Sequence, residues 1–218
     1  LQTSIYYTYL KGNYDFNLNS FLGFPTTDEL YNYAFQSNLI GLFSNYNYHK
    51  NNLNWTTGIH GNIYDRQHIG SELALGELYK NTGFKNEFSA FTKADYTLNR
   101  MTFFADIQYR HVTHNITGID NDKRDITQKH SFNFVNPKIG LTFYGSNKAN
   151  FYASYAMANR EPNRGDFTDA PTTAIPTSER LHDFELGNRL IFKKFSFNTY
   201  RSSIVISLPL HPCTTLVS

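Results

Sequence analysis

The residues best suited to binding chemistry lie in one polar segment, 160–180. Five charged side chains fall within its first ten positions: Arg160, Glu161, Arg164, Asp166 and Asp169. Guanidinium and carboxylate groups make strong, directional hydrogen bonds, and connecting segments on a rigid scaffold often carry function. We therefore take these five residues as candidate ligand-binding residues. The same charges also suit a network of ion pairs that folds the segment against its own strands, and the sequence leaves both interpretations open.

Patterns for catalysis and for metal binding are absent from the sequence. It contains no nucleophile elbow, phosphate-binding loop or His-Glu-x-x-His motif. His111 and His114 are three positions apart, a spacing that places them on opposite faces of a strand. A single cysteine, Cys213, excludes a disulfide framework and a cysteine-based zinc site. We predict that the protein is not an enzyme and holds no metal or other cofactor.

Composition favours a β protein rich in aromatic residues. Aromatic residues make up 17% of the 218 positions, and charged residues make up 17%, against roughly 25% in ordinary soluble domains. No apolar run reaches the roughly 18 residues that a membrane-spanning helix needs. The formal net charge is +2 and the basic residues are scattered, which argues against nucleic acid as a partner.

Apolar and polar residues alternate with the period of two that is typical of β-strands. From 53 to 63 the odd positions hold Leu, Trp, Thr, Ile, Gly and Ile, and the even positions are mostly polar. Segments 88–98 and 101–109 repeat the pattern. The opposite faces of these and later strands carry the charges Lys93, Asp95, Asp106, Arg110, Asp183, Glu185 and Arg189. This pattern predicts one apolar face and one hydrated, charged face.

Strand lengths and connections narrow the fold further. We place strands at about 2–9, 35–48, 53–65, 85–98, 101–113, 134–144, 150–159 and 181–192, with a ninth beginning at 195. Long connections (10–34, 66–84, 114–133 and 160–180) then alternate with short ones (49–52, 99–100, 145–149 and 193–194). Strands of about ten residues with this alternation are typical of outer-membrane barrels. We predict an all-β fold: an antiparallel transmembrane β-barrel segment of about eight or nine strands, with long extracellular loops and short periplasmic turns.

Four stretches resemble the barrel of TonB-dependent outer-membrane receptors of the Bacteroidetes type: 134–141 (FVNPKIGL), 152–167 (YASYAMANREPNRGDF), 179–187 (ERLHDFELG) and 195–199 (FSFNT). The resemblance implies a larger barrel in the outer membrane, closed by an N-terminal plug. It also implies uptake of a scarce small-molecule ligand (siderophore, haem, cobalamin or glycan) with energy from TonB. The expected partners are outer-membrane lipid, the ligand and the TonB complex, which an N-terminal region outside this chain would contact.

Two further expectations concern the C-terminal limit of the barrel sequence and the burial of segment 118–128. We assign residues 1–200 to the partial barrel and 201–218 to an atypical tail that is not native barrel sequence, since no charged residue follows Arg201; a flexible natural terminus is the alternative. Segment 118–128 is polar, so we expect it to bury little surface. Two alternative classes remain open: a complete small eight-stranded outer-membrane barrel, and a soluble β-sandwich binding module.

Overall fold

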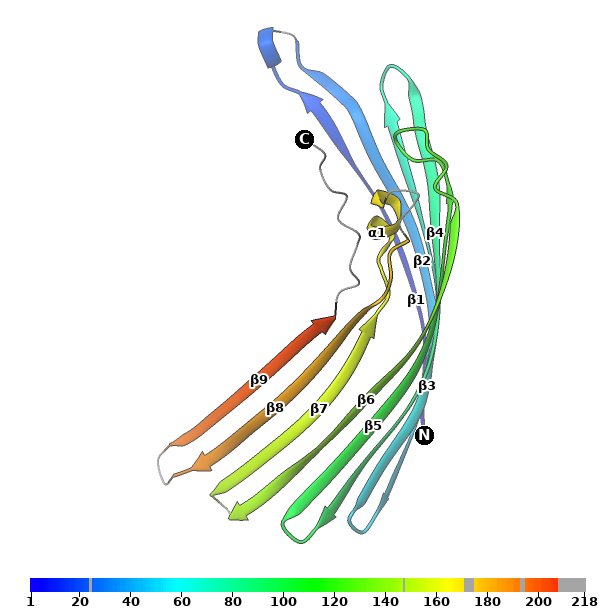
Figure 1. Cartoon of the computed structure of the whole chain (residues 1–218). Coiled ribbons are helices and arrows are strands. Elements are labelled where there is room, and N and C mark those ends of the chain that lie inside the picture. The colour runs from blue at the N-terminus through cyan, green and yellow to red at the C-terminus, as the bar shows by residue number, and fades with distance from the viewer. Residues whose placement is uncertain (24, 147, 171–174, 193–194, 208–218) are drawn as a thin grey trace, which may run out of the picture.

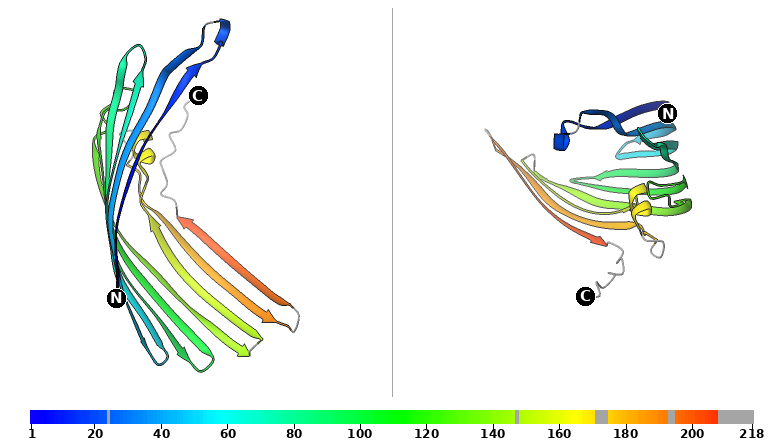
Figure 2. Two further views of the ribbon diagram at one scale, coloured as in Figure 1. Left: turned by 180° about the vertical axis from the view of Figure 1, so that it is seen from behind. Right: turned by 90° about the horizontal axis from the view of Figure 1, so that it is seen from above.

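The computed structural model describes residues 1–23, 25–146, 148–170, 175–192 and 195–207, which form one nine-stranded antiparallel sheet (Figure 1). Each strand pairs with the next along the chain, so β1 and β9 form the two edges. The sheet curves like part of a barrel wall (Figure 2). The strands are β1 Gln2–Leu18, β2 Thr27–Lys50, β3 Leu53–Glu72, β4 Gly76–Leu98, β5 Met101–Gly118, β6 Gln128–Ser146, β7 Ala149–Arg160, β8 Glu179–Ile191 and β9 Ser196–Ser207. Two short helical turns, η1 Phe21–Gly23 and α1 Arg164–Asp169, complete it.

The predicted short connections form antiparallel hairpins, and the tight turns lie together at one end of the strands (Figure 1). The turns after β2 and β4 need a positive φ, which Asn51 (50°) and Asn99 (54°) supply. Asparagine tolerates this left-handed region better than most residues. The turn at 193–194 lies outside the described residues, although β8 and β9 pair on either side of it.

At the other end of the sheet, away from the tight turns, the strands continue well beyond their predicted ends. The expected loop 66–84 is mostly paired, because β3 runs to Glu72 and β4 begins at Gly76. Segments 10–34 and 114–133 are also more than half strand, so the connections there are shorter than the predicted bounds. The cause is that residues on both faces are mostly polar at this level, so the alternation that marks a strand in the sequence disappears. Segment 160–180 remains a long connection, between Arg160 of β7 and Glu179 of β8, and it contains α1.

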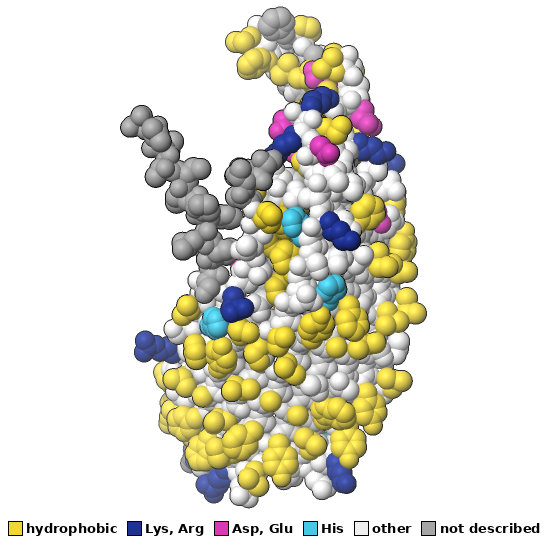
Figure 3. Space-filling model, turned by 45° about the vertical axis from the view of Figure 1, so that its right-hand side comes forward, with side chains coloured by type: hydrophobic (Ala, Val, Ile, Leu, Met, Phe, Trp, Pro, Cys, Tyr) yellow, Lys and Arg dark blue, Asp and Glu magenta, His cyan; other side chains and the backbone are white. Residues whose placement is uncertain are grey.

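The two faces of the sheet differ as the alternation predicts. Large apolar side chains such as Ile59, Ile107 and Ile139 are exposed on the convex, outer face, where Ile107 keeps 48% of its surface accessible. Figure 3 shows hydrophobic side chains as a band over the half of the molecule that carries the tight turns, with charged side chains mainly beyond that band. A band this extensive requires an apolar environment. No helix in the described part of the chain is long and apolar enough to cross a membrane.

The concave, inner face carries the only buried apolar cluster found among the described residues. Ile116, Ile126 and Phe167 form it, and Phe132 packs against it. Within the described ranges no second sheet packs on the first, so the alternative of a β-sandwich is wrong. The sheet is also open between β1 and β9, which does not fit a closed eight-stranded barrel.

Candidate ligand site on the inner face

The connection between β7 and β8 folds inward onto the inner face, and Glu161 anchors it there. This carboxylate is 5% exposed and receives two hydrogen bonds from Arg110: Nη1 to Oε2 at 2.6 Å and Nη2 to Oε1 at 2.9 Å. The ammonium group of Lys85 lies 2.5 Å from Oε1. Arg110 also binds Glu87 at 2.8 Å, so two cations and two anions balance in this cluster. We call Lys85, Glu87, Arg110 and Glu161 the anchor cluster.

The electrostatics of the anchor cluster keep Glu161 ionised. Burial by itself raises the pKa of a carboxyl group. The hydrogen bonds from Arg110 and Lys85 outweigh that effect and hold the pKa of Glu161 at about 2. The side chain is therefore a permanent anion at neutral pH, and the loop is tied to β4 and β5 by charge-assisted hydrogen bonds.

Local sequence explains why a helical turn follows the anchor. Asn163 accepts a hydrogen bond from the backbone N–H of Asp166, and Asp166 accepts one from the backbone N–H of Asn163. This reciprocal arrangement is a capping box. It starts α1 and aims Phe167 at the sheet, where its ring stacks on His130 with centroids 4.1 Å apart. Phe167 is 4% exposed, so it fixes the helix on the inner face.

Segment 118–128 contributes to the same packing, which the sequence did not reveal. Ile126 is 4% exposed within the buried cluster, and Arg124 donates a hydrogen bond to the backbone oxygen of Thr168 at 2.5 Å. Gln128 reaches the backbone oxygen of Phe167 at 3.5 Å. Most of the segment is exposed, as expected from its polarity, and Ile126 is the exception, because one isoleucine among polar neighbours carries no periodic signal.

The five predicted site residues take different positions. Glu161 and Asp166 hold the loop and its helix, as described above, and Asp169 accepts a hydrogen bond from the Thr168 hydroxyl at 3.3 Å. Arg160 forms an exposed ion pair with Glu179 at 2.9 Å. Arg164 donates to the side-chain oxygen of Asn81 at 2.6 Å and lines a cavity. The ion-pair interpretation of the segment thus holds for Arg160 and Glu161.

That cavity, of about 380 Å³, lies between the inner face and the inward-folded loop. We call it the arginine pocket, and its lining is Tyr64, Arg66, His68, Gly83, Lys85, His114, Pro162, Asn163, Arg164 and Gly165. Sequence reasoning missed the lining residues from β3 and β4, and it considered His114 of β5 only as a possible metal ligand. The sequence did carry a signal for them, because alternate residues of a strand lie on the same face. Positions 64, 66 and 68 continue the inward-facing series of β3, and positions 83 and 85 continue that of β4.

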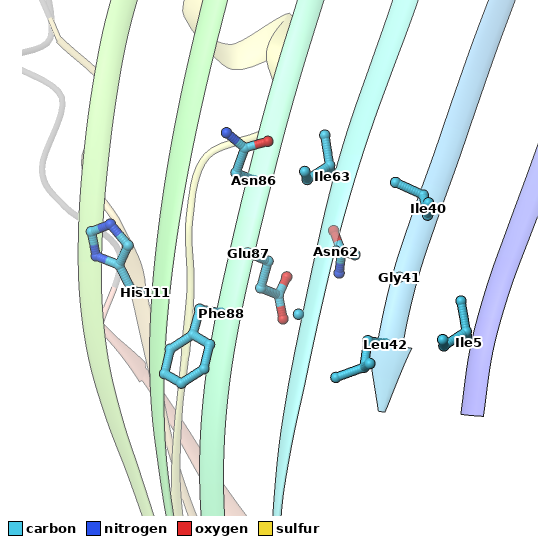
Figure 4. A pocket seen from close by; sticks show the side chains of 11 residues that line it. Ile5, Ile40, Gly41, Leu42, Asn62, Ile63, Asn86, Glu87, Phe88 and His111 are labelled. Atoms are coloured by element: carbon cyan, nitrogen blue, oxygen red, sulfur yellow. The ribbon is translucent and has the colours of Figure 1, made fainter. Parts of the chain in front are cut away.

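A larger hollow of about 550 Å³ lies on the outer face and has a different character. Figure 4 shows Ile5, Ile40, Leu42, Ile63 and Phe88 around it. It exists because Gly61 leaves a gap in the apolar band: a Cβ there would meet only the backbone oxygen of Glu87, at 3.6 Å. Its apolar walls suit hydrocarbon chains and offer little to a polar ligand.

Metal ligation finds no support in the described ranges, where no group of three or more His, Cys, Asp or Glu side chains could hold an ion. The two histidines singled out from the sequence lie on opposite faces, as predicted. His111 hydrogen-bonds Asn133 at 2.8 Å on the outer face, and His114 packs edge-on against Phe167 at 5.5 Å on the inner face. Cys213 lies outside the described residues.

The sheet is open, curved and antiparallel, with an apolar outer band and a polar inner face, and its tight turns lie at one end of the strands. These features define a segment of a large transmembrane β-barrel. The family model described as "TonB dependent receptor-like, beta-barrel" matches residues 1–204, and the chain belongs to this family. No curated protein sequence is significantly similar to the chain.

Solved structures share the fold at low sequence identity. The copper transporter OprC superimposes with a TM-score of 0.74 at 10% identity, covering 94% of this chain and 36% of that one. The ferric yersiniabactin uptake receptor FyuA from Yersinia pestis gives 0.62 at 11% identity, covering 93% and 33%. The unliganded ferric citrate transporter FecA gives 0.62 at 10% identity, covering 86% and 29%. This chain therefore spans about a third of the length of these receptors.

Proposed function

We propose that this chain is part of an outer-membrane receptor for TonB-energised uptake of a scarce small-molecule ligand. The observation that carries the proposal is the pairing of the apolar outer band with a polar, cavity-bearing inner face, in a chain of the TonB-dependent receptor-like barrel family. The outer band would face membrane lipid, and the extended hairpins would point out of the cell. The similar structures are named for copper, ferric yersiniabactin and ferric citrate, so the ligand is a scarce metal or its complex, or another nutrient of this size class such as haem, cobalamin or a glycan.

Within that function we assign ligand contact to the inward-folded loop, whose predicted site residues are Arg160, Glu161, Arg164, Asp166 and Asp169. Arg164 is the one whose side chain faces the arginine pocket, while Glu161 and Asp166 position the loop. The TonB complex would be contacted by another part of the receptor. The sequence stretches at 134–141 and 152–167 support a receptor of the Bacteroidetes type.

Growth of a strain that lacks the receptor gene tests this function. The mutant and its parent are compared on limiting iron, copper, haem, cobalamin and glycan sources, and a strain without TonB is the energy control. We expect the receptor mutant and the TonB mutant to lose growth on the same source, and the receptor to fractionate with the outer membrane. Fractionation with another compartment, or equal growth of mutant and parent on every source, would contradict the proposal.

A further inference from the structure

The arginine pocket differs from the rest of the inner face in its charge. Arg66, Lys85 and Arg164 line it, and no carboxylate lies among its lining residues. The Lys85 ammonium is already paired with Glu161 in the anchor cluster. Neither arginine forms an ion pair within the described part of the chain. The pocket therefore concentrates two uncompensated positive charges in a confined space.

Several polar atoms of the pocket are buried without a hydrogen-bond partner among the described residues. They are Nε of Arg66, Nε of Arg164 and Nδ1 of His114, whose residue is 6% exposed. The Arg66 guanidinium lies over the ring of Phe35, 4.4 Å from its centroid, which fixes its plane. Arg164 is held at its other end by Asn81. Burying a polar atom without a partner is costly, so a pocket lined by three such atoms has hydrogen-bonding groups available for a ligand.

The arginine pocket also has space for a ligand beside its two guanidinium groups. Gly83 on β4 pairs with Arg66 on β3 and presents no side chain to the inner face, which leaves room next to the two guanidinium groups. A Cβ at Gly83 would lie 3.8 Å from Cδ of Arg164, at the boundary of the pocket. A volume of about 380 Å³ holds a small organic anion or the charged end of a larger ligand.

We propose that the arginine pocket binds an oxyanion group, a carboxylate or a phosphate, of the ligand that the receptor takes up. Planar guanidinium groups recognise both oxyanions through paired N–H donors. Outside the anchor cluster, Asp169 of α1 lies close to the pocket, because its Oδ2 would be 3.8 Å from a Cβ placed on the lining residue Gly165. The inference rests on the proposed function for the identity of the ligand as cargo. The binding itself requires neither transport nor TonB.

Calorimetric titration of the complete receptor in detergent tests the site, with citrate and inorganic phosphate as oxyanion probes and glucose as a neutral probe. We expect saturable binding of at least one oxyanion and none of glucose. Arg66→Gln and Arg164→Gln are each expected to weaken that binding at least tenfold. Gly83→Leu, which fills the pocket without changing charge, is expected to abolish it.

Lys93→Gln is the matched control. Lys93 is an inward-facing lysine on β4, outside the lining of the arginine pocket. It should leave oxyanion binding within twofold of wild type, and heat-modifiable gel migration verifies that each variant still forms a barrel. The proposal is overturned if the unaltered receptor binds neither oxyanion, as would happen if a carboxylate of the receptor itself fills the pocket. Equal losses in Lys93→Gln and Arg164→Gln would also overturn it. Growth defects in the strain comparison with no oxyanion binding would refute this site while leaving the uptake function intact.

Discussion

Replacing Glu161 with glutamine removes the negative charge that ties the inward-folded loop to β4 and β5. Breaking a buried ion pair from one side costs about 3–5 kcal/mol when the remaining charge has no other partner. Here Arg110 keeps Glu87, and the Lys85 side chain is 34% exposed and can reach water. We therefore expect a smaller cost, about 2–3 kcal/mol, borne by the docked state of the loop.

Amide hydrogen exchange of residues 163–169 in the complete receptor measures this cost directly. Each 1.4 kcal/mol is a factor of ten in an equilibrium, so Glu161→Gln should speed exchange in α1 by roughly 30- to 150-fold. Glu179→Gln is the matched control, because it removes one carboxylate from the exposed pair with Arg160, whose side chains are 38% and 70% accessible. Exposed pairs contribute about 0–1 kcal/mol, so exchange should rise less than about fivefold. Equal effects of the two substitutions would refute the anchoring role of Glu161.

Acid should release the same loop. Because the pKa of Glu161 is lowered from 4.5 to about 2 in the folded protein, its contribution is complete above about pH 4.5. That contribution decreases as the pH falls and is lost as it passes through about 2. Exchange in α1 should therefore accelerate below pH 4.5 in the wild type beyond the intrinsic pH dependence of amide exchange. Glu161→Gln should show only the intrinsic dependence, and an identical excess in both proteins would assign the effect to other groups.

The remaining predictions concern the faces, the buried cluster and the sidedness of the barrel. Ile107→Arg on the outer face should cost about 2–4 kcal/mol in refolding into lipid vesicles, and Asp106→Arg on the inner face much less, whereas equal costs would reverse the assigned faces. Phe167→Ala should destabilise the docked loop by about 3–4 kcal/mol and make it susceptible to protease, and unchanged resistance would argue against its packing role. With Cys213 replaced, Asp122→Cys should react with an impermeant thiol reagent on intact cells and Asn99→Cys only after the outer membrane is broken, and the opposite pattern would invert the topology.

The hairpins and the two faces were predictable from sequence because a membrane-spanning strand meets hydrocarbon on one side and water on the other. Because of that difference, apolar and polar residues alternate in segments such as 53–63 and 101–109. The interruption of this alternation at Asn99 predicts the tight turn there. Above the apolar band the contrast ends, so the extensions of β3 and β4 to Glu72 and Gly76 carried no such signal. The charges of segment 160–180 were visible, but their partners were not.

Only the tertiary structure decided what those charges do. Glu161 meets Lys85 and Arg110 across 76 and 51 positions of sequence, a juxtaposition created by the register of β4 with β5 and the inward fold of the loop. The arginine pocket likewise joins Arg66 to Arg164 through packing of Phe167 on His130. The alternation of apolar and polar residues indicates which face a residue occupies, since each position of a barrel strand faces either lipid or water. It does not record which distant side chain lies opposite, because that depends on the packing of segments far apart in the chain.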